Sequence, residues 1–184
     1  MKIDRIHHVA YRCRDAKETV EWYGRMLKMD FQLAIAEDRV PSTKEPDPYM
    51  HIFLDAGNGN TLAFFELPTK APMGRDENTP VWVQHIAFRV KDREELLAYK
   101  AHLEAQGVEV LGPTDHGAFH SIYFFDPNGH RLELACPDPD EANMLRRMDE
   151  VKWKMLEDWS KTKRAPKHAE FFHRREFTPE TTTA

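Results

Sequence analysis

Two histidines and two glutamates recur at matching places of an internal repeat. The first copy reads H-V-A-Y-R-C-R-D from His8, and the second reads H-I-A-F-R-V-K-D from His85. A glutamate stands near the end of each copy, Glu66 in the first and Glu133 in the second. Two imidazoles and one or two carboxylates suit a divalent transition metal with open coordination positions. The repeat therefore predicts a metal site.

The number of carboxylates bears on which metal is expected. Two histidines and one carboxylate form the face that holds non-haem Fe(II), whereas a second carboxylate favours an octahedral Ni, Zn, Mn or Co site. We expect a divalent metal, with Fe(II) favoured and Ni, Zn, Mn or Co as alternatives. Whether Glu66 joins His8, His85 and Glu133 as a ligand is open at this point.

Each copy is expected to fold as a β-α-β-β-β unit that positions these side chains. Alternating apolar residues predict the first strands, and apolar residues at helical spacing predict the helices that follow. If the first and last strands of a unit are neighbours, an inward residue on each faces the same cavity. The predicted strands are 6–13, 31–36, 49–54, 61–67, 83–90, 108–111, 118–125 and 130–136, the predicted helices are 16–29 and 93–106, and the proline-rich segment 39–48 is predicted as a loop.

The fold class predicted from this order is α+β. One domain is expected over residues 1–140, with its first unit at about 3–67 and its second at about 82–136. Residues 141–184 are expected to form a C-terminal helix and a tail, because an apolar stripe recurs at helical spacing from Met144 to Trp159.

Composition narrows the function classes. The chain has 184 residues, of which 41% are apolar, so it can bury a core. Its net charge of −5 gives no electrostatic reason to expect nucleic acid or an anionic membrane as a partner. Cys13 and Cys136 do not make a disulfide framework, and no signal peptide or apolar span is recognised, so a cytoplasmic protein is expected.

The repeated unit and its ending D-P-N-G-H-R-L-E resemble the vicinal oxygen chelate superfamily over about residues 3–136. That superfamily includes glyoxalase I, type I extradiol dioxygenases, fosfomycin-resistance enzymes and bleomycin-resistance proteins. The resemblance implies two paired units that form a U-shaped mixed sheet around a metal. It also implies that His8, His85 and Glu133 are the ligands, with Glu66 as a candidate fourth.

Small single-domain extradiol dioxygenases give the closest resemblance, carried by the stretch from His116 to Gly129. In such enzymes an active-site tyrosine and a nearby histidine serve the reaction, and the resemblance assigns these roles to Tyr123 and His116. The leading hypothesis is therefore an Fe(II)-dependent extradiol-type dioxygenase. Its small-molecule substrate would be a catechol-like aromatic, and O2 would be the second substrate. Tyr123 would contact the substrate, and His116 would act as an acid or base.

Two alternatives stay open. A glyoxalase I-like (lactoylglutathione lyase-like) enzyme would use all of the His-Glu-His-Glu set, including Glu66. A binding protein of the bleomycin-resistance kind would sequester a small molecule without a metal. A homodimer is expected in each case, since small members of this superfamily are often dimers. The sequence does not show whether the two units pair within one chain or across a dimer.

Overall fold

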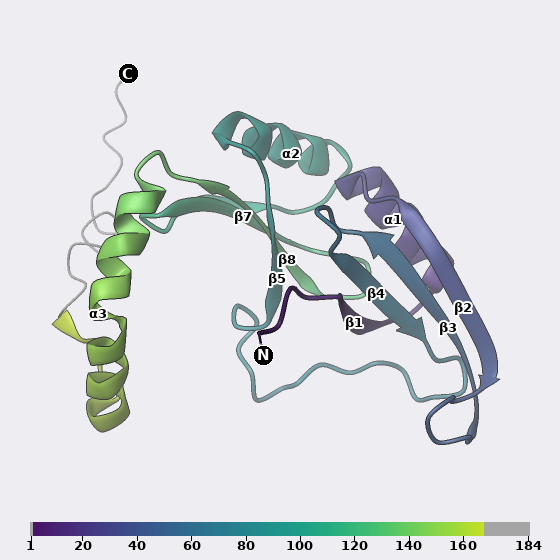
Figure 1. Ribbon diagram of the computed structural model, residues 1–184. Helices are drawn as coiled ribbons and strands as arrows, with labels where there is room; N and C mark the ends of the chain where they lie inside the picture. Colours follow the sequence, from purple (N-terminus) through teal and green to yellow (C-terminus); the bar gives the residue numbers. More distant parts are fainter. Residues whose placement is uncertain (1, 168–184) are drawn as a thin grey trace. The chain divides into compact units, whose positions relative to one another are not determined.

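A computed structural model describes residues 2–167 of the chain (Figure 1). The order β-α-β-β-β occurs twice and is followed by a C-terminal helix, as the sequence predicts. The first repeat contains β1 (His8–Cys13), α1 (Ala16–Leu27), β2 (Phe31–Arg39), β3 (Pro46–Asp55) and β4 (Thr61–Glu66); the second contains β5 (His85–Arg89), α2 (Arg93–Ala105), β6 (Leu111–Asp115), β7 (Phe119–Phe125) and β8 (Arg131–Pro137); α3 (Glu141–Thr162) follows.

The strands form two four-stranded sheets with the same internal order. The first sheet is ordered β1-β4-β3-β2 and the second β5-β8-β7-β6. In the first sheet β1 runs parallel to β4, while β3 runs antiparallel to both of its neighbours. Both sheets therefore bring the first and last strands of a repeat side by side. The predicted α+β class with paired βαβββ units is confirmed.

The described chain divides into two compact units, which are described separately below. One comprises residues 1–86 and 125–132, and the other comprises residues 87–124 and 133–184. The turn between β7 and β8 of the second repeat therefore belongs to the first compact unit. The C-terminal segment predicted for 141–184 begins as the helix α3, and its residues from 168 onward lie outside the described part.

Both repeats begin their helix with the same cap. The Asp15 carboxylate accepts a hydrogen bond from the Glu18 N–H at 2.7 Å, and the Asp92 carboxylate accepts one from the Glu95 N–H at 3.0 Å. A side-chain oxygen at this position satisfies a backbone N–H that has no partner within the helix. The two aspartates that end the repeated octapeptide thus fix where each helix starts.

The core of the first unit lies between α1 and one face of its sheet (Figure 1). Tyr23 of α1 is fully buried and lies 5.2 Å from Phe64 of β4, measured between ring centroids. Because side chains alternate along a strand, Leu62 shares this face with Phe64, and both are buried. The residues between them, such as Ala63, point to the opposite face.

A buried polar network holds the β7–β8 turn against α1. The Tyr23 hydroxyl donates to the Asp126 carboxylate at 3.1 Å, and the Asn128 amide donates to the Thr19 hydroxyl at 3.1 Å and to Asp126 at 3.0 Å. The Asn128 side-chain oxygen accepts from the Arg14 N–H at 2.8 Å. All these polar groups have a partner, so their burial is compensated. The D-P-N-G turn is therefore part of the core of the first unit.

Two segments differ from the sequence-based prediction. Residues 39–48 were expected to be a loop, but β3 begins at Pro46. The pairing of β3 with β4 begins at Met50, so the residues of β3 before Met50 have no β4 strand beside them. Proline is tolerated there because no N–H donor is needed on that side. Residues 112–117 were also expected to be a loop, yet β6 runs to Asp115 past Pro113. The register shift between Leu111 and Thr114 accommodates this proline in an edge strand.

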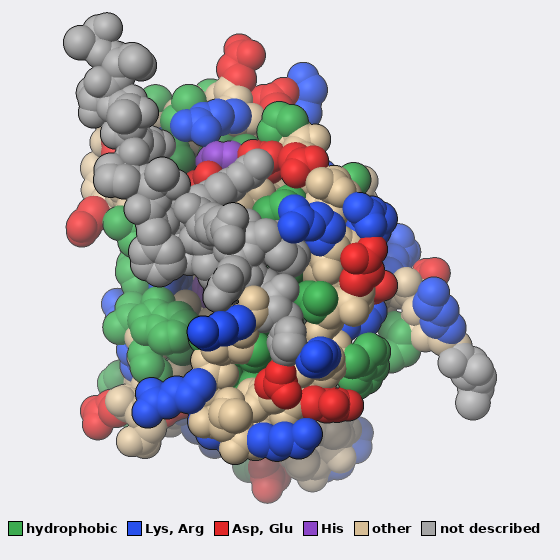
Figure 2. All heavy atoms as spheres, turned by 90° about the vertical axis from the view of Figure 1, so that its left-hand side faces the viewer, with side chains coloured by type: hydrophobic (Ala, Val, Ile, Leu, Met, Phe, Trp, Pro, Cys, Tyr) green, Lys and Arg blue, Asp and Glu red, His purple; other side chains and the backbone are tan. Residues whose placement is uncertain are grey.

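Helix α3 exposes much of its apolar surface. Leu145, Trp153 and Leu156 are 55%, 71% and 57% exposed. Figure 2, which views the molecule from the α3 side of Figure 1, shows hydrophobic side chains at the surface among Lys and Arg side chains. None of the helices within the described residues has the length and apolarity needed to cross a bilayer.

Candidate active site

His8 and His85 occupy the same position in their repeats, since each is the first residue of a first strand and each is exposed. His85 Nδ1 lies 3.0 Å from the Val83 carbonyl oxygen. Only a protonated nitrogen can donate this hydrogen bond, so in the neutral ring that makes it Nε2 carries the lone pair. Metal-binding histidines are commonly oriented in this way. His85 is therefore prepared to act as a ligand through Nε2.

His8 is surrounded by aromatic rings and by a second histidine. Its Nδ1 lies 2.8 Å from Nδ1 of His7, so one of the two rings donates and the other accepts. The ring centroids of His51 and Phe53 lie 6.3 and 5.9 Å from that of His8. Burial and the neighbouring His8 lower the pKa of His51 below its usual value. His7 precedes β1, which begins at His8, so strand alternation does not set the direction of the His7 side chain.

Glu133 lies in the middle of β8 and is 3% exposed. Its carboxylate accepts a hydrogen bond from the hydroxyl of Ser121, which is fully buried on β7. A carboxylate held away from water is costly unless hydrogen bonds and positive charge compensate it. This chemistry fits a cation ligand. Sequence reasoning missed Ser121, although its place two residues before Tyr123 puts both side chains on one face of β7.

The structure brings the side chains of His116 and Tyr123 together. His116 Nε2 lies 2.8 Å from the Tyr123 hydroxyl. The His116 ring is also stacked on Phe119, with 4.9 Å between centroids and 28° between the planes. The His116 N–H donates to the Phe119 carbonyl at 2.9 Å, which closes the β6–β7 connection. The pair is thus held by its own hairpin.

Glu66 is placed away from His8 by the strand register. On the parallel strands β1 and β4, His8 is opposite Thr61 and Glu66 is opposite Cys13. Cys13 lies five positions after His8 on β1, which is about 16 Å along a strand. Because five is an odd number, the side chains at these positions point to opposite faces of the sheet. The Glu66 carboxylate instead accepts the Ala16 N–H at 2.7 Å, at the start of α1. The structure does not bring Glu66 to His8.

The residue that corresponds to Glu133 in the first repeat is Ala63. The turns that precede β4 and β8 are equivalent, because the Ala56 N–H donates to the Asn60 carbonyl and the Asp126 N–H donates to the His130 carbonyl, both at 3.0 Å. Ala63 lies as far along the chain from Ala56 as Glu133 lies from Asp126. Ala63 is opposite Ala10, on the same face as His8. The first repeat therefore carries no carboxylate where the second carries Glu133.

Within residues 2–167 the structure shows no ready-made cluster of three or more His, Cys, Asp or Glu side chains that could hold an ion. His8 and His85 belong to the first compact unit, and Glu133 belongs to the second. Their donor atoms, two imidazoles and one carboxylate, are suited to a divalent transition metal. Their role as ligands remains a proposal, which is argued below.

Comparison with known proteins gives the family. The model of the Glyoxalase/Bleomycin resistance protein/Dioxygenase superfamily matches residues 5–134. MhqA of Bacillus subtilis (strain 168), which carries the provisional name of ring-cleaving dioxygenase, is 30% identical over 142 residues. That match covers 75% of this chain but 42% of MhqA, so the chain spans less than half the length of this relative.

Two solved structures show the same fold at lower identity. The trypanothione-dependent glyoxalase I of Leishmania major is 20% identical with a TM-score of 0.56, and the match covers 86% of this chain and 99% of that one. The fosfomycin resistance protein FosX of Listeria monocytogenes, complexed with Mn(II) and a dihydroxypropylphosphonic acid, is 20% identical with a TM-score of 0.53, and the match covers 77% and 99%. With its family model matched over most of its length, the chain belongs to the glyoxalase/bleomycin resistance protein/dioxygenase superfamily.

Proposed function

We propose that this chain is a metal-dependent dioxygenase that cleaves the ring of a catechol-like aromatic, with His8, His85 and Glu133 as the metal ligands. The observation that carries the proposal is the asymmetry of the two repeats, in which Ala63 stands where the second repeat has Glu133. It leaves two histidines and one carboxylate, the set that suits Fe(II) in oxygenases. The similarity to MhqA supports the same reaction class.

When bound, Fe(II) supplies the Lewis acidity and the redox chemistry that ring cleavage by O2 requires. The chain's own residues prepare the ligands for that ion. The hydrogen bond from His85 to the Val83 carbonyl keeps Nε2 unprotonated, and the Ser121 hydroxyl orients the Glu133 carboxylate. Both effects set the direction of a donor atom before any metal arrives.

His116 and Tyr123 form the proposed acid–base pair. A hydrogen bond of 2.8 Å between the imidazole Nε2 and the phenol oxygen allows a proton to be held on either atom. Tyr123 shares its face of β7 with Ser121, whose hydroxyl reaches Glu133. The pair can therefore donate a proton to a substrate oxygen or take one from it.

The test is O2 uptake by protein loaded anaerobically with Fe(II) and offered a panel of substituted catechols. The proposal expects one O2 consumed per catechol and a coloured ring-opened product that contains both oxygen atoms. Fe(II)-loaded protein that takes up no O2 with any catechol would contradict it. Isomerisation of a hemithioacetal, followed in the same samples, would indicate lyase chemistry instead. Tight ligand binding by metal-free protein would indicate a binding function.

The lyase alternative loses its main support in this structure. It was based on Glu66 as the fourth ligand, but the Glu66 carboxylate is bonded to the Ala16 N–H on the helix-covered face of the sheet. Ala63, which lies on the same face of the sheet as His8 and corresponds to Glu133, has no ligating atom. We therefore leave Glu66 out of the proposed ligand set.

A further inference from the structure

The first unit contains an apolar pocket beside the proposed metal ligand His8. The pocket has a volume of about 830 Å³, within the range of small-molecule sites. Its floor is a row of residues that face one another across three strands: Arg12 is opposite Phe65, and Phe65 is opposite His51. Arg12 lies four residues after His8 on β1, so the two share a face of the sheet.

Aromatic rings form one wall of this pocket. The His51 ring is stacked on Phe65, with 3.6 Å between centroids and 19° between the planes. Tyr49 lies 5.6 Å from Phe65 at a tilt of 58°. Val40 and Leu67 add apolar surface. Flat aromatic ligands pack well against such walls, by offset stacking and by edge-to-face contact.

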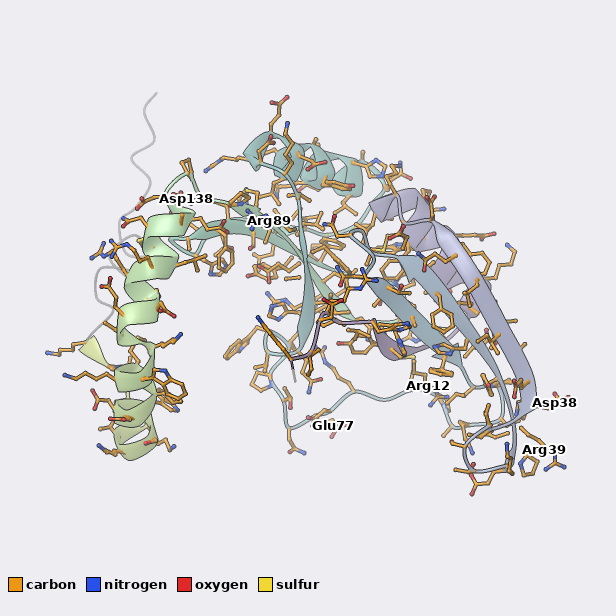
Figure 3. All side chains as sticks on the ribbon, in the orientation of Figure 1. Arg12, Asp38, Arg39, Glu77, Arg89 and Asp138 are labelled. Carbon is orange, nitrogen blue, oxygen red and sulfur yellow. The ribbon has the colours of Figure 1, made fainter. Side chains whose placement is uncertain are left out.

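Arg12 brings a positive charge to the pocket. One of its terminal nitrogens donates to the Ala71 carbonyl at 2.7 Å, which anchors the guanidinium (labelled in Figure 3). Its Nε is shielded from water and has no hydrogen-bond acceptor among the described residues. His51 Nε2 is in the same situation. A buried donor such as the Arg12 Nε–H is costly until an acceptor arrives.

The one carboxylate in the lining described for this pocket is already engaged. Asp47 is paired with Lys70 at 2.9 Å and accepts a hydrogen bond from the Thr69 hydroxyl at 2.7 Å. These bonds lower the pKa of Asp47 and hold it as an anion directed to partners of its own. The pocket therefore combines aromatic walls with a guanidinium whose hydrogen-bond partners among residues 2–167 are backbone carbonyls.

We propose that this pocket binds an aromatic carboxylate, with the ring against Phe65 and Tyr49 and the carboxylate paired with Arg12. Combined with the proposed function, on which this step rests, this pocket assigns the substrate as a catechol that carries an acidic side chain. Arg12 lies four positions after His8 on β1, which is about 13 Å along the strand. This spacing leaves room for one substituted ring between the two side chains.

The test compares the binding of 3-phenylpropionate and its neutral amide to metal-free protein by calorimetry. The acid should bind at least about tenfold more tightly, since a charge-assisted pair is worth more than a neutral hydrogen bond. Arg12→Gln should remove the preference and Arg12→Lys should keep part of it. The matched control Arg25→Gln, at an exposed position on α1, should leave it unchanged.

Equal affinity for acid and amide, or no binding of either at millimolar concentration, would overturn the proposal. So would a preference that survives in folded Arg12→Gln protein. The comparison of the two ligands on the unaltered chain needs no variant, so it stands even if Arg12→Gln fails to fold. Neither metal nor O2 is present, so a failure of ring cleavage does not affect this result. A failure here would leave ring cleavage itself standing.

Discussion

Tyr123 is the residue at which the proposed chemistry can be separated from metal binding. Its hydroxyl oxygen lies 2.8 Å from Nε2 of His116, and neither residue is a proposed metal ligand. Tyr123→Phe removes only the oxygen of this pair. We expect kcat for ring cleavage to fall by about 10²-fold, as for the loss of a general acid or base, while bound iron stays at the wild-type level.

The measurement is steady-state O2 uptake alongside iron analysis of the same samples. Tyr99→Phe, in which a half-buried hydroxyl on α2 is lost, serves as the matched control and should keep full activity. Unchanged kcat in Tyr123→Phe would remove this pair from the mechanism.

The buried thiol of Cys13 has a titration that can be tested. Cys13 is 2% exposed, and burial raises its pKa to about 11, helped by the nearby Glu66 and Asp15 carboxylates and opposed by a hydrogen bond with Thr19. The folded state therefore holds the proton more tightly than the unfolded state. Its contribution to stability is complete below the unfolded value of 9.0 and is lost as the pH rises from there towards 11.

Urea unfolding at pH 8 and at pH 10.5 measures this effect. The free energy of unfolding should fall between the two pH values, and it should fall less in Cys13→Ala than in the unaltered chain. An equal fall in both proteins would show that the Cys13 thiol does not cause the alkaline loss.

At the scale of elements, the D-P-N-G turn is more than a connection between β7 and β8. Asn128 bonds to Thr19 and Asp126 through its amide nitrogen and to the Arg14 N–H through its oxygen. Asn128→Ala would remove these three hydrogen bonds, including the one that the Arg14 N–H donates to the Asn128 oxygen. We expect the free energy of unfolding to fall by about 2–3 kcal/mol, measured by urea titration.

The equivalent turn of the first repeat offers a control. The Asn60 side-chain amide donates to the Gly57 carbonyl of its own turn at 3.1 Å, and the residue is partly exposed. Asn60→Ala should therefore cost less than Asn128→Ala. Similar losses at both positions would contradict the view that the β7–β8 turn is held by its contacts with α1.

The elements also show what a sequence can and cannot establish. Repetition of the octapeptide, together with apolar alternation and helical spacing, was enough to predict both βαβββ units, because these patterns depend on neighbours in the chain. Strand register depends on contacts between distant segments. From the sequence, Glu66 therefore looked equivalent to Glu133. Aligning the two equivalent turns instead places Ala63 at the position of Glu133. The hydrogen bond from Ser121 to Glu133 joins two strands and was missed for the same reason.

At the scale of the molecule, the homodimer expected from the sequence stays a prediction. Exposed apolar side chains on α3, among them Trp153 and Leu156, give the chain a surface that a second copy can cover. Light scattering should then give twice the chain mass of 21.6 kDa. A mass of 21.6 kDa at micromolar concentration would contradict it.

The central claim is that one metal ion is held by His8, His85 and a single carboxylate. It is tested most directly by titrating metal-free protein anaerobically with Fe(II) and comparing the unaltered chain with Glu133→Gln and Glu66→Gln. The account predicts one iron per chain in the unaltered protein and in Glu66→Gln, and loss of binding in Glu133→Gln. Loss of iron in Glu66→Gln with a folded chain, or full binding in Glu133→Gln, would contradict it.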